Sequence, residues 1–284
     1  MYKRQAQDRR PSHCIALVEN VPGLEVIHRA SWSDAIAPAS WRDEIERANW
    51  RDEVPAQSVR IHYVDHAMFL IQTPGALSMV TDYSGFLGPE DYVPDVVTMN
   101  RAHGTHWTAS PDPRIPNVLT GWNPDGPGPI EHYLELGDVL IRNVATDIRS
   151  GFGGGVAPDG NSIFVFEAEG LCIGHLGHLH HEPTPEQFAA IGRLDVVMAP
   201  VDGGMTLDLP SMISVLQRLR SSVVIPMHWF SLGGLQTFLA GMQDDFRIDV
   251  REGSSMEVSL RSLPSEPTIV VLRPRFLGAG DAVE

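Results

Sequence analysis

Lysine is nearly absent from this sequence, and basic residues as a whole are few. The chain of 284 residues contains one lysine, Lys3, and its 21 Lys and Arg residues stand against 36 Asp and Glu residues, giving a formal net charge of −15. Schiff-base chemistry and a Walker-type phosphate loop both need a lysine side chain and are effectively excluded. Nucleic acids and anionic membranes need a basic face on their partner. We therefore expect no nucleic acid and no membrane as partners, and leave assembly into a homo-oligomer open.

Cysteine and long apolar runs are also scarce. The two cysteines, Cys14 and Cys172, lie far apart in the sequence, so we expect no disulfide framework and a reducing compartment. Cys172 lies in the apolar stretch GLCIGHL and is expected to be a small buried residue. No apolar run approaches the roughly 20 residues of a membrane-spanning helix, and the first residues lack the apolar core of a signal peptide. These features predict a cytoplasmic protein, with the periplasm as the alternative.

The sequence pattern changes at about residue 58. Residues 1–57 are irregular, with evenly spaced tryptophans, and are expected to form an arm that packs on a single domain of residues 58–284. A short helix is expected within the arm, over residues 41–49. From residue 59 onward, short apolar runs separated by turn residues predict strands. Residues 108–130, rich in proline and glycine, predict a long loop.

The second half of the chain alternates between strand and helix patterns. Thr184 is followed by Pro185 and then by Gln187, which predicts the start of a capped helix. Apolar residues at helical spacing predict another helix within residues 207–220. Between these helices, short apolar runs predict strands, so that two sheets covered by helices are the expected result.

Histidine is the abundant chemically active side chain. There are 12 histidines, and several follow directly after apolar strand patterns: His66, His103, His106, His178, His180, His181 and His228. A lone histidine is more often a surface or packed residue than a ligand. Loops at strand ends, however, are where a rigid scaffold presents functional groups. Neutral imidazole is the commonest metal ligand, so the pattern indicates a metal site.

Five stretches of the chain, taken in order, carry a specific resemblance. They are YVDHAMFLIQTPG (63–75), VTDY (80–83), GNSIFVFEAEGLCIGHLGHLHHEPTPEQ (160–187), LDVVMAPVDGG (194–204) and VVIPMH (223–228). Together they resemble the metallo-β-lactamase fold superfamily, in the branch that is similar to ascorbate-6-phosphate lactonase. The resemblance implies an α/β (α+β) fold, a four-layer αββα sandwich with metals at one edge between the sheets.

The metal-binding motif of that superfamily, H-x-H-x-D-H, is altered in this chain. The corresponding residues read R-A-H-G-T-H, so that Arg101 replaces the first histidine and Thr105 replaces the aspartate. A further family histidine falls near Asp147, where no histidine is present. The bridging aspartate of the family corresponds to His178, and the final histidine is kept as His228.

The resemblance implies two adjacent metal positions, between which the remaining ligands can be divided. One position keeps His106, His178 and His228, and three imidazoles with a water molecule form a suitable mononuclear zinc site. The other keeps His103, with Asp147 as a further candidate. We therefore expect one zinc ion rather than two, with manganese or iron as alternatives.

Substitution of carboxylates by neutral or basic residues changes the charge of the expected site. Arg101 places a positive charge where the family binds a cation, which favours an anionic substrate and a more acidic metal-bound water. The candidates for proton transfer are Asp147, His180 and His181.

Further candidates lie beside the expected ligands. His66, Trp107 and Trp229 are assigned to the substrate pocket, because such pockets are mostly apolar with a few polar groups. Packing beneath the ligand loops is an equally weighted role for the two tryptophans. Asp65 and Asp202 are candidates for hydrogen bonds to the ligands.

Two functions are consistent with these residues. The favoured one is a metal-dependent hydrolase, in which a metal-bound hydroxide attacks a small anionic lactone, ester or phosphoester. The alternative is a catalytically inactive relative that binds a small anion or a metal. Three or four imidazoles converging around an open position would favour the enzyme, and two would favour the binding protein. A redox site of iron or manganese is a third, less favoured reading, because carboxylate ligands are missing.

Overall fold

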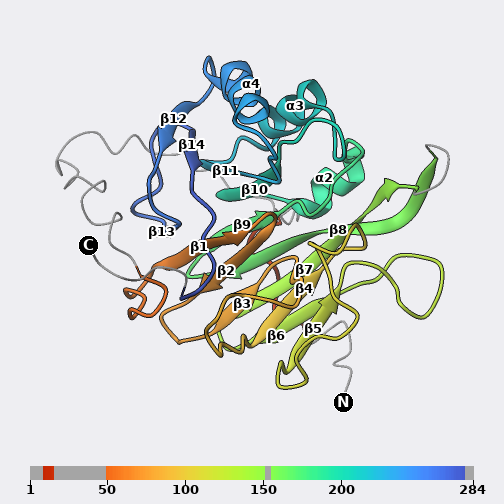
Figure 1. Ribbon diagram of the computed structural model, residues 1–284, viewed down its shortest axis with the longest axis vertical. Coiled ribbons are helices and arrows are strands. Elements are labelled where there is room, and N and C mark those ends of the chain that lie inside the picture. Colours follow the sequence, from red (N-terminus) through yellow and green to blue (C-terminus); the bar gives the residue numbers. More distant parts are fainter. Residues whose placement is uncertain (1–8, 16–48, 151–154, 279–284) are drawn as a thin grey trace, which may run out of the picture.

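Two β-sheets pack face to face and form the body of the protein (Figure 1). The structure is a computed structural model that describes residues 9–15, 49–150 and 155–278. The first sheet contains β1 (Val59–Asp65), β2 (Met68–Gln72), β3 (Ser78–Val80), β4 (Val96–Met99), β5 (Asn117–Thr120) and β13 (Ser255–Val258). The second sheet contains β6 (Tyr133–Leu136), β7 (Val139–Arg149), β8 (Val156–Ala168), β9 (Leu171–His175), β10 (Val196–Pro200), β11 (Val223–Met227), β12 (Arg247–Val250) and β14 (Thr268–Val271). The helices are α2 (Pro185–Ile191), α3 (Leu209–Leu219) and α4 (Leu232–Met242).

Both sheets are mixed. The first has the order β13-β1-β2-β3-β4-β5 and is antiparallel from β13 to β3 and parallel from β3 to β5. The second has the order β12-β14-β11-β10-β9-β8-β7-β6, with its parallel part between β12 and β9. Parallel strands end at the same edge of a sheet, so the loops that follow β9, β10 and β11 emerge together.

The main core lies between the two sheets. Alternate residues of β1, such as Ile61 and Tyr63, pack there against Phe164 and Ile225 of the second sheet. β10 and β11 are buried at every position. Strands covered on both faces read as continuous apolar runs, and the sequences VVMAP and VVIPM have this form.

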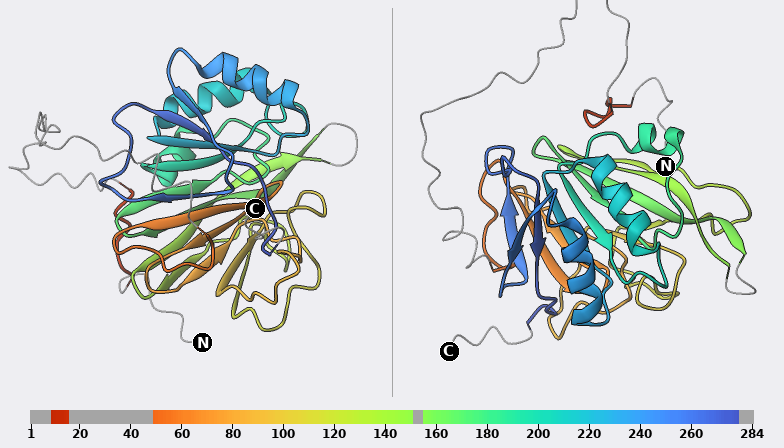
Figure 2. Two further views of the ribbon diagram at one scale, coloured as in Figure 1. Left: turned by 60° about the vertical axis from the view of Figure 1, so that its left-hand side comes forward. Right: turned by 90° about the horizontal axis from the view of Figure 1, so that it is seen from above.

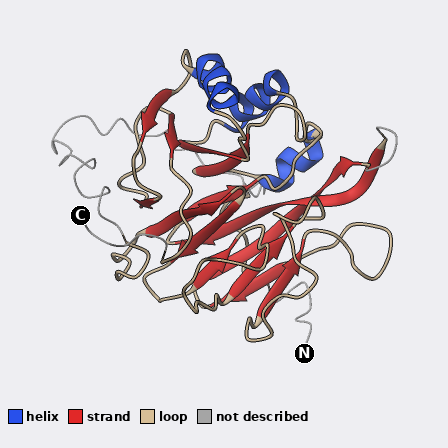
Figure 3. Ribbon diagram, in the orientation of Figure 1, coloured by secondary structure: helices blue, strands red, loops and turns tan. Residues whose placement is uncertain are grey.

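Helices cover the outer face of the second sheet (Figure 3). Met212 and Leu216 of α3 and Phe238 of α4 pack on that face in one buried cluster. Figure 2 shows the same layering from two further sides. The outer face of the first sheet is covered by loops, which contribute Trp50, Trp107 and other aromatic side chains. No helix of the described residues is long and apolar enough to cross a membrane.

Most elements expected from the sequence are present. The helix after Thr184 has the expected capping box, in which Thr184 and Gln187 bond each other's backbone amides. The expectation for residues 108–130 was wrong in part, because β5 lies within them and pairs in parallel with β4. The sequence pattern also missed β6 and α4. The helix expected over residues 41–49 lies almost wholly outside the described residues, and the division into an arm and a single domain stays a prediction.

The expectation that the cysteines are unpaired was wrong. Cys14 and Cys172 form a disulfide, although 158 residues separate them in the sequence. The bond fastens residues 9–15 to β9, and Ser12 and the backbone amide of His13 also donate hydrogen bonds to the buried Glu167 of the neighbouring strand β8. Only the tertiary structure brings this short segment to β9. Disulfides are rare in reducing compartments. The bond therefore removes the cysteine-based argument for a cytoplasmic location, and that location stays a prediction.

Candidate metal centre

Histidines from loops of both sheets meet at one edge of the sandwich. His66 lies in the turn between β1 and β2, and His103 and His106 follow β4. From the second sheet, His178 follows β9 and His228 follows β11. The sandwich therefore brings together side chains from loops that are distant in the sequence.

The imidazole rings are close enough to share one ion. His66, His103, His106 and His228 each offer one ring nitrogen, and these four atoms lie within 4.8 Å of one another. The His178 ring centre lies 5.0 Å from those of His106 and His228 and 5.3 Å from that of His103. Nε2 of His103 and Nε2 of His228 are 3.3 Å apart. Two nitrogen ligands of one tetrahedral zinc, each at about 2.0–2.1 Å, have roughly this separation.

A buried carboxylate fixes the ring of His106. Nδ1 of His106 lies 2.5 Å from Oδ2 of Asp82, and the side-chain amide of Asn100 donates to Oδ1 of Asp82 at 2.8 Å. Burial raises the pKa of Asp82 to about 6, although His175 and the Asn100 amide act against it. The carboxylate holds Nδ1 and leaves Nε2 of His106 free for a ligand, as in carboxylate–histidine–metal arrangements.

A second carboxylate faces His228. Nδ1 of His228 lies 3.1 Å from Oδ1 of Asp202, which also accepts a hydrogen bond from Thr206. Burial raises the pKa of Asp202, but the hydrogen bonds from His228 and Thr206 outweigh it, so the net pKa lies below the usual value. The backbone amide of His228 donates to the carbonyl of His66 at 2.9 Å, which joins the two ligand loops.

Several residues of the site have strained backbones. His66, Asp82 and His228 have φ angles of 45°, 43° and 56°, in the left-handed region that non-glycine residues seldom adopt. Such conformations cost free energy and persist only where surrounding contacts impose them. Their concentration at the imidazole cluster supports a functional role for this edge of the sandwich.

The altered motif still orients its histidine. Thr105, at the position of the family aspartate, places its Oγ1 2.8 Å from Nδ1 of His103. On the other side, the backbone amide of His178 donates to Oδ1 of Asn161 at 2.8 Å. A side chain at Gly177 would lie only 2.4 Å from that same oxygen, so the loop before His178 requires glycine.

The free ring nitrogens test whether a metal fits. Nε2 of His66, Nε2 of His106 and both ring nitrogens of His178 are buried and have no hydrogen-bond partner among the described residues. Buried polar atoms in proteins are almost always paired. A divalent cation that prefers imidazole would supply the missing partner for these nitrogens, so the donor set fits such an ion.

Burial favours the neutral state of four of these rings, which is the state that metal ligation requires. Burial, followed by the neighbouring imidazoles, lowers the pKa of His66 and of His178 to about 2. The same causes lower the pKa of His103 and, more strongly, of His106. Imidazoles that stay neutral offer their lone pairs to a cation at neutral and mildly acidic pH.

These shifts predict how the stability of the metal-free protein depends on pH. Unfolded histidines titrate near pH 6.5, whereas folded His66 and His178 titrate near 2, so the unfolded state binds more protons between these values. The free energy of unfolding should therefore fall as the pH drops below about 6.5. Thermal unfolding of EDTA-treated protein at pH 7.0, 6.0 and 5.0 measures the slope. His178→Asn should flatten it, and an unchanged slope would contradict the assignment.

The proton-transfer candidates lie outside the imidazole cluster. Oδ1 of Asp147 accepts the backbone amide of Asp159 at 3.1 Å, within the β7–β8 hairpin. His180 accepts a hydrogen bond from Nε of Arg149 at 2.6 Å, and its ring centre is 4.8 Å from that of His181. Asp147 is thus engaged in the hairpin, and the two histidines are in contact with each other.

The expected pocket residues have different surroundings. His66, assigned to the pocket from the sequence, lies within the imidazole cluster. Trp107 packs edge-on against Trp122 at 5.7 Å, and Trp229 packs against the buried cluster beneath the helices. Neither Trp107 nor Trp229 lines the large cavity beside the site, whereas Trp122 does. No sequence motif pointed to Trp122.

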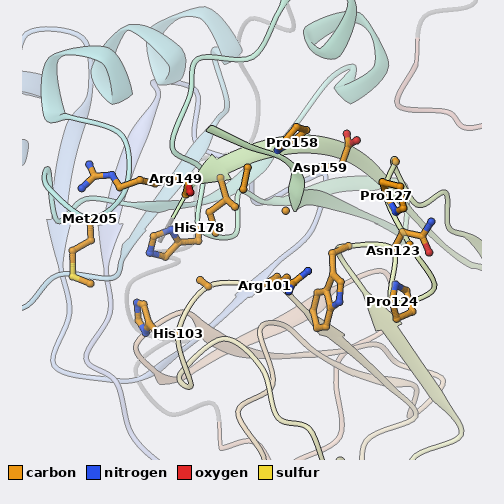
Figure 4. Close-up of a pocket in the computed structure, with 18 residues that line it drawn as sticks. Arg101, His103, Asn123, Pro124, Pro127, Arg149, Pro158, Asp159, His178 and Met205 are labelled. Atoms are coloured by element: carbon orange, nitrogen blue, oxygen red, sulfur yellow. The ribbon is translucent and has the colours of Figure 1, made fainter. Parts of the chain in front are cut away.

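A cavity of about 760 Å³ opens beside the imidazoles. Figure 4 shows His103 and His178 on one side of it and Asn123, Pro124 and Pro127 on the other, with Arg101 between them. Its volume lies within the range typical of small-molecule sites, about 300–1,000 Å³. The site therefore combines candidate metal ligands with room for a substrate.

Comparisons with known proteins agree with this geometry. The family model of the beta-lactamase superfamily domain matches residues 60–228. A UPF0173 metal-dependent hydrolase from Anaeromyxobacter sp. (strain K) is 24% identical over 234 residues, which cover 70% of this chain and 83% of that protein. A UPF0173 protein from Pyrococcus abyssi is 21% identical over 190 residues, covering 62% of this chain and 86% of that protein.

A solved structure is similar in both sequence and fold. It is a Thermotoga maritima protein assigned as a zinc-dependent hydrolase of the metallo-β-lactamase superfamily. It is 28% identical to this chain, with a TM-score of 0.52, and the match covers 76% of this chain and all of that one. The sandwich described above is therefore of the metallo-β-lactamase type.

Proposed function

This chain belongs to the beta-lactamase superfamily, and we propose that it is a metal-dependent hydrolase acting on a small anionic lactone, ester or phosphoester. One observation carries the proposal: four imidazole nitrogens lie within 4.8 Å of one another, and several ring nitrogens of the cluster have no hydrogen-bond partner in the part of the chain that the structure describes. Two converging histidines would have suited a binding protein. Four converging histidines beside a cavity favour catalysis.

The residues that would hold the ion are those whose free nitrogens converge. They are His66, His103, His106 and His228, with His178 alongside. A bound divalent ion supplies a Lewis acid and lowers the pKa of a coordinated water. Zinc is the ion proposed, because the set is rich in imidazole and, in the four-histidine group, lacks carboxylate.

The chain's own residues then have distinct tasks. Asp82 and Asp202 hold the rings of His106 and His228, and Thr105 holds the ring of His103. The backbone bond between His228 and His66 keeps the two ligand loops together. Preorganised rings reduce the cost of ligand reorganisation during the reaction.

We propose one ion rather than two. The second position of the family is altered by Arg101, whose guanidinium donates hydrogen bonds but cannot ligate a metal. A substrate anion near the ion would gain from this second positive charge. The similarity to a lactonase branch makes phosphorylated or carboxylated lactones the first class to assay.

The substitutions in the motif predict a change of stoichiometry. Arg101→His combined with Thr105→Asp restores two ligands of the H-x-H-x-D-H pattern, so the variant should bind closer to two ions per chain. Native mass spectrometry with added zinc measures this number. Arg101→Met, which removes the charge without adding a ligand, is the control. A ratio that stays at the parent value would contradict our account of the motif.

Elemental analysis tests the proposal most directly. Protein purified without added metal should contain about one equivalent of a transition metal, and EDTA should abolish hydrolysis of a panel of lactones, esters and phosphoesters. Restoring the ion should restore the rate. Metal content without any hydrolysis would favour the binding protein instead. Absence of metal after reconstitution would refute both the hydrolase and a metal-binding relative, and would leave only the anion-binding alternative.

A further inference from the structure

The cavity extends well beyond the imidazoles, and its far part has its own chemistry. Its wall includes Trp122, the prolines Pro124 and Pro127 and two arginines, Arg101 and Arg149. A scissile bond at the ion would occupy only one side of a space of about 760 Å³. The remainder is available to a second group of the same substrate.

The two arginines of the cavity differ in their contacts. Arg149 is tethered, because its Nε donates to His180 at 2.6 Å and its Nη2 donates to the carbonyl of Gly204 at 2.9 Å. Arg101 is exposed and makes no hydrogen bond or ion pair within residues 9–15, 49–150 and 155–278. An arginine with all its donors free in a cavity wall is suited to pairing with a planar oxyanion.

The negative charge of the whole chain makes a positively charged side chain in the cavity wall, such as Arg101, important for anion binding. The formal net charge is −15, so the protein as a whole repels anions. Some exposed arginines are neutralised by carboxylates, as Arg114 is by Asp91 and Asp112. Arg101 has no such partner among the described residues and lies in the cavity wall, so it provides a local site where an anion can bind.

A flat apolar surface lies in the same cavity. The Trp122 ring is braced by Trp107, whose ring centre lies 5.7 Å away at an angle of 71°. Pro124 and Pro127 provide rigid apolar walls nearby. An indole face held in place by a neighbouring ring binds planar groups by stacking, at little entropic cost.

We infer that the substrate carries a carboxylate or phosphate separate from its scissile bond, bound by Arg101, and a flat ring that packs on Trp122. The substrate class is thus an aromatic or heterocyclic oxyanion with a hydrolysable ester, lactone or phosphoester bond. This inference rests on the proposed function for the reaction itself, but the binding it describes needs no metal.

Binding of small probes to the EDTA-treated protein tests the inference. The probes are benzoate, phenyl phosphate, acetate and the neutral benzamide, titrated by calorimetry. Benzoate or phenyl phosphate should bind about 10- to 100-fold more tightly than benzamide, as expected for hydrogen bonds to a charged group. The ratio of the benzoate affinity to the phenyl phosphate affinity tells whether the oxyanion is a carboxylate or a phosphate. Arg101→Met should remove the preference over benzamide, and Arg101→Lys should keep part of it.

Two further variants separate the ring from the charge. Trp122→Leu should weaken benzoate until it binds no better than acetate, while Arg114→Met, outside the cavity, should change nothing. Equal affinities for benzoate and benzamide, or an unchanged Arg101→Met variant, would overturn the inference. Failure of the proposed function looks different: probes would bind as described, but the metal-loaded protein would hydrolyse nothing.

Discussion

His228→Asn is expected to lower the affinity for the metal by more than about 100-fold, and to reduce hydrolysis in proportion. Loss of a residue that merely orients a ligand costs about 10- to 100-fold, so loss of the ligand itself should cost more. Asparagine is the suitable replacement because φ at this position is 56°, a conformation that it tolerates better than alanine. Competition with a chromophoric chelator measures the affinity.

Graded variants make this expectation sharper. Asp202→Asn leaves the His228 ring in place but weakens its orientation, so a loss of about 10- to 100-fold is expected. His180→Asn removes a nearby histidine outside the converging group and should leave the metal content unchanged. A parent-like affinity in His228→Asn, or equal losses in all three variants, would show that the converging rings do not hold the ion.

Cys14→Ser should lower the free energy of unfolding by about 2–5 kcal/mol, because the disulfide closes a long loop and restricts the unfolded chain. For a domain of this size the loss corresponds to a fall in Tm of roughly 5–15 °C. The segment that the bond holds also contributes a hydrogen bond from Arg193 N to the carbonyl of Cys14 at 2.8 Å. Thermal unfolding followed by circular dichroism measures the change.

Several comparisons isolate the covalent bond from the other contacts of that segment. Cys172→Ser and the double variant should match Cys14→Ser, since each removes the same bond. Ser12→Ala keeps the disulfide but deletes the hydrogen bond to Glu167 and the one that Ser12 Oγ accepts from the Cys14 backbone amide, and it should cost about 0.5–1.5 kcal/mol for each bond that water replaces. A Tm that is the same with and without dithiothreitol, together with a parent-like Cys14→Ser, would mean that the bond contributes nothing.

The elements predicted best were those whose pattern depends on local physics. Residues adjacent in the sequence determine the apolar runs of β1, β2, β10 and β11, and also the capping box at Thr184. The structure contains all of these features. β5 was not predicted, because it is a short strand within a region rich in turn residues. Its pairing with β4, and therefore its conformation, depends on a neighbour outside its own sequence.

The site was predicted in part, for a related reason. The positions of His103, His106, His178 and His228 directly after apolar strands marked them as candidates. His66 was placed in the pocket, because a histidine in a turn gives no sign of its partners. The supporting contacts, such as Asn100 with Asp82, connect residues that no local pattern relates.

By itself, the sequence determined the charge, the run of strands and helices, and the strand-end histidines, because these follow from composition and from the periodicity of neighbouring residues. Tertiary structure decided which rings share one site, which arginines line the cavity, and that Cys14 reaches Cys172. These features depend on distances between residues on different strands and loops of the sandwich. They depend on how two sheets pack and on where their strand ends meet, which no stretch of adjacent residues encodes.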